Sequence, residues 1–250
     1  MSPFVVSTVA FAAMFGGALA GMYLRRRLPG HHLLDDSRDV VKLAGGLVGT
    51  LAALVLGLLV ASGKGFYDAQ NSELTQMSAD IVLLDHSLRH YGPETADART
   101  TLRATVQAVL ERSDASHRSV IASVSTVEGA DVLYDKIEAL EPKTDMQRDL
   151  KSQCLAMAVG LGRNRWLMFE QAAASVSMPL LVVMISWLTV TFGIWGVLAP
   201  MNRTLLATMF IAAMSSAGAI YLILEMYSPY RGLIQVSSAP LRAALSHLSQ

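Results

Sequence analysis

The chain has 250 residues, no formal net charge at pH 7 and a mean hydropathy of +0.41. Because it contains one cysteine, Cys154, it cannot form an intrachain disulfide or a zinc site of the Cys-x-x-Cys type. Residues 64–170 carry 12 basic and 16 acidic side chains, which excludes a basic surface suited to nucleic acid, so no nucleic acid is expected as a partner.

Four stretches of the chain contain no charged residue, and each is long enough to cross a lipid bilayer. They cover residues 2–24, 43–63, 171–202 and 204–224. A helix rises about 1.5 Å per residue, so about 20 apolar residues span the ~30 Å of hydrocarbon. The sequence therefore predicts an all-α polytopic membrane protein with four transmembrane helices. The lipid bilayer is its expected partner.

The first apolar stretch is predicted to stay in the mature protein. Ala18-Leu19-Ala20 is similar to a signal-peptide cleavage site. However, no basic residue precedes the stretch and Arg25-Arg26-Arg27 follow it, whereas a signal peptide carries its positive charge first. The charges therefore favour a retained anchor over a cleaved leader.

Three of the spans carry pairs of small residues four positions apart, which places each pair on one helix face. The pairs are Gly17 and Gly21, Gly45 and Gly49, and Ser215 and Ala219. Such faces let two helix backbones approach closely, and close packing drives helix association in lipid, where no hydrophobic force acts between helices. We expect helix packing at these faces, either within one chain or between subunits.

The segment between the second and third spans has the pattern of amphipathic helices. Apolar residues recur at steps of three and four from residue 74 to residue 91, where Gly92-Pro93 is expected to end the helix. A second helix is predicted from residue 93, a weaker third over residues 116–140, and a fourth after Thr144, which forms a capping box with Gln147. Together they predict a helical extramembrane bundle between spans two and three.

These elements divide the chain into four segments. Residues 1–64 hold the first two transmembrane helices, and residues 65–170 form the water-exposed helical domain. Residues 171–226 hold the third and fourth transmembrane helices. Residues 227–250 form a tail with a short amphipathic helix, which either lies on the membrane surface or docks on the bundle.

Basic residues near the span ends favour an N-terminus outside the cytoplasm, because cytoplasmic connections are enriched in Lys and Arg. The first connection carries Arg25, Arg26, Arg27, Arg38 and Lys42. With Arg203 added, this side has six basic residues against five on the other, so the preference is small.

Several motifs, in this order, resemble those of one known family. They are ALVLGLLVASGKGFYD (53–68), YGPE (91–94), RW (165–166), LAPMN (198–202), LILEMYSPYRGLI (222–234) and SSAPL (237–241). In these motifs the chain resembles the bestrophin-like family of bacterial integral membrane proteins, a domain of unknown function. The family's name implies distant kinship to bestrophins, which are pentameric anion channels.

The resemblance implies a homo-oligomer, a pentamer by analogy, with anions as partners. It also implies termini and a helical region in the cytoplasm, opposite to the orientation that the charges favour. The chain departs from the family pattern at Tyr227, where an acidic residue is expected after Glu225-Met226. No acidic run like the calcium clasp of bestrophins is present in the sequence.

The candidate pore residues lie in the second span and at the ends of spans. They are Val48, Leu51, Val55 and Leu58, which can form a hydrophobic constriction, with Lys64 and Glu225 at span ends. A charge at bilayer depth is costly and usually functional, so Glu225 either lines a vestibule or pairs with Lys64 or Arg231. The alternative is an ordinary charge at the interface.

Other polar groups carry weaker signals. His86 and His90 share a helix face, but Asp85 and Arg89 beside them favour a solvated face over a metal site. Cys154 is expected to be a small buried hydrophobe. The sequence has no His-Glu-x-x-His, Gly-x-x-x-x-Gly-Lys or Gly-x-Ser-x-Gly motif, so we expect neither an enzyme nor a cofactor.

The leading hypothesis is a homo-oligomeric anion or ion channel of the bacterial inner membrane. The alternative is a membrane-anchored sensory or scaffold protein, in which the helical bundle senses a ligand and partner proteins supply the output.

Overall fold

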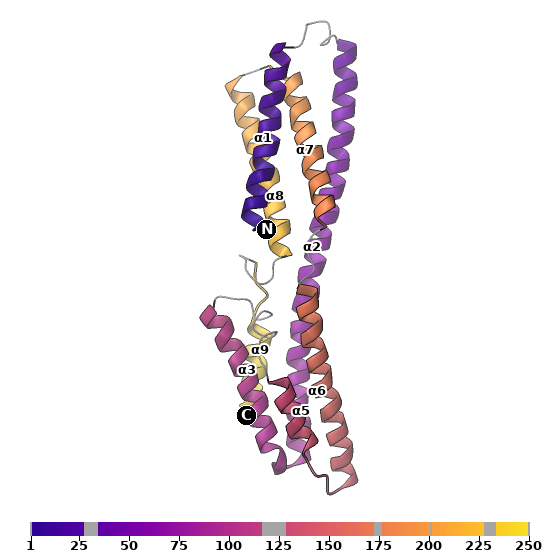
Figure 1. The fold of residues 1–250 in the computed structure, drawn as a ribbon, viewed down its shortest axis with the longest axis vertical. Coiled ribbons are helices and arrows are strands. Elements are labelled where there is room, and N and C mark those ends of the chain that lie inside the picture. Colours follow the sequence, from indigo (N-terminus) through magenta and orange to yellow (C-terminus); the bar gives the residue numbers. More distant parts are fainter. Residues whose placement is uncertain are drawn as a thin grey trace. The chain divides into compact units, whose positions relative to one another are not determined.

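The computed structural model describes residues 2–27, 35–116, 129–172, 177–200, 202–227 and 234–249. These residues form helices and short connections with no strand among them, and four of the helices are long and apolar enough to cross a membrane. The prediction of an all-α polytopic membrane protein is therefore confirmed. The chain packs as two compact units (Figure 1): a membrane unit of Met1–Gly65 and Ser175–Tyr227, and a helical unit of Phe66–Ala174 and Ser228–Gln250.

The membrane unit contains α1 (Pro3–Arg27), the first part of α2 (Asp35–Tyr91), α7 (Met178–Leu198) and α8 (Arg203–Met226). Pro179 lies in the first turn of α7, where its missing N–H has no intrahelical partner to lose. Asn202 caps α8, because its side-chain oxygen accepts a hydrogen bond of 2.7 Å from the backbone N–H of Leu205. These two signals fix the connection between α7 and α8 at residues 199–202.

Glycine contacts bring the backbones of α1 and α7 together. A Cβ atom added at Gly21 would overlap the carbonyl oxygen of Gly193, and one added at Gly196 would overlap that of Ala18. At Gly17 the added atom would lie 2.8 Å from the carbonyl oxygen of Thr189. The two backbones therefore touch with no side chain between them, which is the closest packing that two helices can reach.

The helical unit contains the rest of α2, the 3-10 helix η2 (Pro93–Thr95), α3 (Ala96–Ser116), α5 (Ala130–Glu138), α6 (Asp145–Ala172) and α9 (Ala239–Leu248). The predicted apolar stripe of α2 is buried, and it shares one core with one side of α3. The core residues of these two helices include Leu74, Met77, Ile81, Leu84, Leu88, Ala98, Leu102, Val106 and Val109. The predicted helix end is also confirmed, because α2 ends at Tyr91. Gly92 follows with a φ of 134°, a conformation that glycine alone adopts readily.

Thr144 caps α6 as predicted, since its hydroxyl accepts a hydrogen bond of 3.1 Å from the N–H of Gln147. The Gln147 side chain accepts a bond of 2.8 Å from the N–H of Lys143, one residue before the position that a capping box uses.

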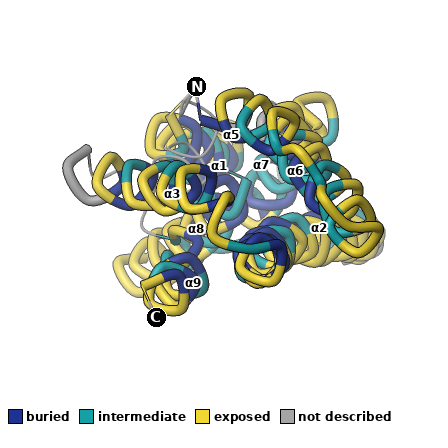
Figure 2. The backbone as a smooth tube through the Cα atoms, turned by 90° about the horizontal axis from the view of Figure 1, so that it is seen from below, coloured by how far each residue is buried: buried dark blue, intermediate teal, exposed yellow. Residues whose placement is uncertain are grey.

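The tail helix α9 docks on the bundle, the second of the two predicted alternatives. Its buried face, Leu241, Ala244 and Leu248, belongs to the core of the helical unit, and its other face is exposed (Figure 2). The described residues of the tail, 234–249, therefore pack with the helical unit.

The main departure from the predicted elements is the length of α2, which is one helix of 57 residues. Its residues were predicted to divide between the second span and the bundle at residues 64–65. No proline interrupts α2, and a glycine in a helix interior costs only about 1 kcal/mol, so Gly63 and Gly65 do not end it. The boundary between the units at Gly65 thus lies inside a helix.

Two of the predicted features lie outside the described residues. One is the part of the weak third helix at residues 117–128; α5 lies in its described part. The other is Arg231, a proposed partner of Glu225.

We expect Gly21→Ala to destabilise the membrane unit by about 1–3 kcal/mol, because the added methyl group must push two touching backbones apart. The matched control is Gly16→Ala on the same helix, where an added Cβ would meet nothing within 4 Å. Unfolding in SDS, followed by circular dichroism of the protein in micelles, measures both variants. A wild-type midpoint for Gly21→Ala would contradict the close contact between α1 and α7.

Candidate functional site

One side of α2 in the membrane unit is covered by other helices and the other side is open. The covered side is lined by Gly45, Ala52 and Leu59. Gly45 lies against α7, where a Cβ added to it would stand 3.0 Å from the Ile194 side chain. The open side carries large apolar side chains, with Leu54 67% exposed. Within a bilayer, this side contacts lipid, a second copy of the chain or the water of a pore.

The predicted constriction residues lie at the border between these two sides. Val48 and Val55 are half-buried, whereas Leu51 and Leu58 are exposed, Leu58 to 62%. Their neighbours on the open side include Gly46 and Gly57, at which an added Cβ would meet nothing within 4 Å beyond its own helix. The structure thus leaves a continuous apolar surface on α2, and its role as a pore wall stays a prediction.

The small-residue pairs occupy different environments. Gly17 and Gly21 lie at the contact with α7 described above, and Gly49 lies near Thr191 of α7, with 3.6 Å between an added Cβ and the Thr191 methyl. On α8, Ser215 is exposed and Ala219 is half-buried. The small residues of α8 that enter the core are instead Ala213 and Ala217, which have the same spacing. The Ser215 side of α8 therefore remains accessible in the single chain.

The span-end charges Glu225 and Lys64 differ in burial. Glu225 is only 3% exposed, and the Tyr221 hydroxyl one turn earlier on α8 forms a hydrogen bond with its side chain. Lys64 is exposed. The buried carboxyl group sets Glu225 apart from an ordinary interfacial charge, while its pairing with Lys64 stays a prediction.

Tyr227, where the resemblance implies an acidic residue, connects the end of α8 to α2. Its hydroxyl donates a hydrogen bond of 2.7 Å to the Ser62 Oγ, and its ring lies 3.2 Å from the position of a Cβ added at Gly63. An acidic side chain has no ring to place there. Tyr227 thus makes a packed aromatic contact that the acidic residue implied by the resemblance would lack.

Two arginines converge on the C-terminal end of α7. Arg25 Nη1 and Arg38 Nη2 donate hydrogen bonds of 2.7 Å and 3.0 Å to the same carbonyl oxygen, that of Leu198. The last carbonyl groups of a helix lack intrahelical partners and carry partial negative charge, so both guanidinium groups are favourably placed. These contacts tie the ends of α1 and α7 to the start of α2. In the sequence, both arginines were noticed only as basic residues near span ends, and no signal indicated that they bind the end of α7.

The surface around His86 in the helical unit is not uniformly solvated, which corrects one expectation. His86 and His90 are exposed, with their Nε2 atoms 3.0 Å apart. Asp85, however, is buried, and it accepts hydrogen bonds of 2.7 Å from Arg99 Nε and 3.2 Å from Arg89 Nη2. Bonding to Asp85 raises the pKa of Arg99 further. Among the described residues, no group of three or more His, Cys, Asp or Glu side chains is suited to hold a metal ion.

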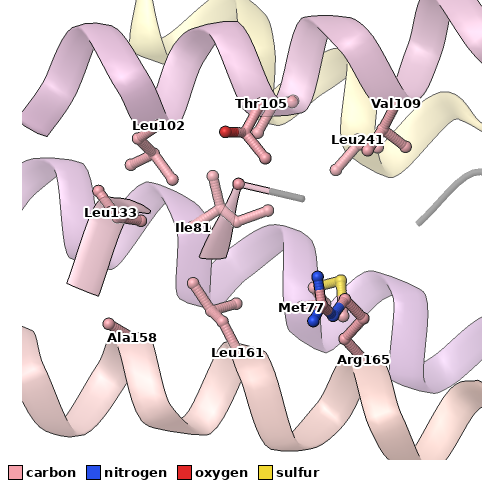
Figure 3. Close-up of a pocket in the computed structure, with 12 residues that line it drawn as sticks. Met77, Ile81, Leu102, Thr105, Val109, Leu133, Ala158, Leu161, Arg165 and Leu241 are labelled. Atoms are coloured by element: carbon pink, nitrogen blue, oxygen red, sulfur yellow. The ribbon is translucent and has the colours of Figure 1, made fainter. Parts of the chain in front are cut away.

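A cavity of ≈ 80 Å³ lies inside the helical unit (Figure 3). Helices α2, α3, α5, α6 and α9 line it mainly with aliphatic side chains, among them Ile81, Leu102 and Leu133. Arg165 supplies the charge of this lining, and Figure 3 shows its guanidinium group beside Met77, at the end away from Leu133. Helical periodicity identified several of these residues as core, but it contains no signal for the space between them.

Cys154 is buried in the same core, as expected. Burial raises the pKa of its thiol from 9.0 to about 11, because the thiolate would lose its hydration. Very little thiolate therefore forms near neutral pH, which disfavours redox chemistry at this position.

A family model described as Bestrophin-like domain matches residues 12–241, which include helices of both units. No curated protein and no solved structure matches the chain. The family indicated by the sequence motifs is thereby confirmed.

We expect Arg99→Ala to destabilise the helical unit by about 3–5 kcal/mol, because it removes one cation from a buried carboxylate. Arg148→Ala is the matched control, since Arg148 pairs with Asp145 at 2.6 Å on the exposed surface, where a pair contributes about 0–1 kcal/mol. Urea unfolding of both variants in micelles gives the two changes. Equal losses would mean that the Asp85 pair behaves like a surface pair.

Proposed function

Because the chain belongs to the bestrophin-like family, we propose that it is a homo-oligomeric ion-conducting protein of the bacterial inner membrane, with anions as the conducted species. The observation that carries this proposal is the uncovered apolar side of α2 in the membrane unit. One α2 helix cannot enclose a pore by itself. Conduction therefore requires several copies of the chain, with their α2 helices arranged around a common axis.

The residues at the border of that side suit a hydrophobic constriction. Leu51 and Leu58 stand two turns apart on one face of α2, with Val48 and Val55 beside them. A ring of such side chains from several subunits excludes water when narrow and admits hydrated ions when it widens. Gly46 and Gly57 leave room on the adjacent side for a neighbouring helix to approach closely.

The family resemblance and the distribution of basic residues support opposite membrane orientations. The bestrophin kinship supports a pentamer with cytoplasmic termini, whereas the basic residues near the span ends support an N-terminus outside. A reporter fused at the tail distinguishes the two orientations. The proposal assigns the chain no catalytic step.

The second candidate function is a sensory protein, and the apolar cavity in the helical unit is the observation that favours it. In that case the membrane unit anchors the sensor and other proteins respond to it. A monomeric or dimeric particle that purifies with a stoichiometric partner supports this function over conduction.

The test of conduction is chloride flux in liposomes that contain the purified protein. We expect flux above that of empty liposomes, and several-fold more for Leu58→Ser, because a hydroxyl group in the constriction favours wetting. The matched control is Val60→Ser, whose exposed side chain points about 200° around the helix from Leu58, away from the predicted constriction, and should leave the flux unchanged.

Two outcomes would count against the assignment. Flux equal to that of empty liposomes for the wild type and for Leu58→Ser contradicts conduction itself. A gain of flux in Val60→Ser but not in Leu58→Ser keeps conduction and moves the pore to the other side of α2.

A further inference from the structure

We propose that His86 and His90 bind a divalent transition ion, with their two Nε2 atoms as neighbouring ligands and Cu²⁺ as the ion that fits best. Both residues belong to the helical unit, so this inference does not depend on ion conduction. An ion held there links the last two turns of α2, which ends at Tyr91.

The first argument is the position of the two histidines on their helix. His86 and His90 lie four residues apart on α2, so their side chains project from the same face one turn from each other. Both side chains are exposed, which gives an ion and its water ligands access to the nitrogen atoms.

The second argument is the distance between the ligand atoms. The two Nε2 atoms are 3.0 Å apart, and the ring planes are inclined at 73°. Metal–imidazole bonds of about 2.0–2.1 Å place two nitrogen atoms about 2.9 Å apart at a right angle and about 3.4 Å apart at a tetrahedral angle. The observed distance is that of a right-angled pair, the geometry of tetragonal Cu²⁺ and Ni²⁺ sites, and Cu²⁺ binds most tightly among the divalent first-row ions.

The third argument concerns the proton that an ion would replace. Without an ion, one of the two rings donates its N–H to the nitrogen atom of the other. Such a hydrogen bond between exposed groups contributes little to stability, because water competes for both partners. An ion bonds both nitrogen atoms at once, and the ligand atoms already stand at the required distance.

The surroundings of the pair also suit neutral nitrogen ligands. Arg89 donates a hydrogen bond of 3.2 Å to the buried Asp85 carboxylate, and Arg99 bonds the same carboxylate at 2.7 Å. These three side chains leave one positive charge in excess, so the affinity must come from metal–nitrogen bonds and not from electrostatic attraction. Beside His86 lies a hollow of ≈ 140 Å³, also lined by His247, which has room for a hydrated ion.

The probe is Cu²⁺ alone, titrated into the full chain in nanodiscs after purification without a polyhistidine tag. Calorimetry measures the affinity and the number of ions bound, and electron paramagnetic resonance reports the nitrogen atoms that bind the ion. We expect one tightest site per chain, with two nitrogen ligands and with Zn²⁺ binding more weakly than Cu²⁺.

His86→Gln and His90→Gln should each weaken this site roughly 100-fold, because a two-point chelate becomes a single contact. Glutamine keeps a polar side chain at these exposed positions, and circular dichroism checks that each variant is folded. The matched control is His247→Gln, which removes another exposed imidazole of the helical unit. Among the described residues His247 belongs to no group of three potential ligands, so the Cu²⁺ affinity should not change.

Four results would each overturn the proposal. They are no saturable Cu²⁺ binding, a single nitrogen ligand in the wild-type spectrum, unchanged Cu²⁺ affinity in the double variant His86→Gln/His90→Gln, and a loss in His247→Gln as large as that in His86→Gln.

Discussion

Backbone contact between α1 and α7 is the interaction on which the membrane unit depends. Water drives helices together in a soluble protein, but lipid tails are as apolar as the side chains, so association in the bilayer relies on close van der Waals packing. Glycines at 21, 193 and 196 allow that packing here. Helix α1 also contacts α8, where Ala213 and Ala217 enter the core with Ala10 and Met14 of α1. With α1 at the centre of these contacts, one side of α2 is left uncovered.

Polar contacts at the helix ends add to the helix packing that the glycines allow. Arg25 and Arg38 meet at the Leu198 carbonyl group, and Tyr227 reaches Ser62 at the end of α8. Arg25, Arg38 and Tyr227 lie just outside the apolar stretches, so their hydrogen bonds do not require a charge in hydrocarbon. Among the described charged residues of the membrane unit, Glu225 is the one that is buried, so its environment differs from that of a surface carboxylate.

Helical periodicity predicted the core of the helical unit because it reports which side of a helix is apolar. The apolar residues that recur at steps of three and four from Leu74 to Tyr91 lie on one such side. It failed where the outcome depends on neighbours. The pairs Ser215–Ala219 and Ala213–Ala217 have equal spacing, and only the position of α1 decides between them. Asp85 looked like a surface residue because its partner Arg99 lies on the next helix. The cavity beside Arg165 arises from the fit of several helices, so no single segment encodes it.

The uninterrupted course of α2 has a consequence for how the protein is held in the membrane. The α2 helix is about 85 Å long and its backbone hydrogen bonding is continuous. The position of the membrane surface along α2 is therefore determined by its side chains alone. The depth of α2 is therefore set by the hydration of a few groups, Arg38 and Lys42 before the apolar stretch and Lys64 and Asp68 after it. A vertical displacement of α2 together with the helices packed on it breaks no backbone bond within α2, so the cost of that displacement comes from moving these charged groups out of water.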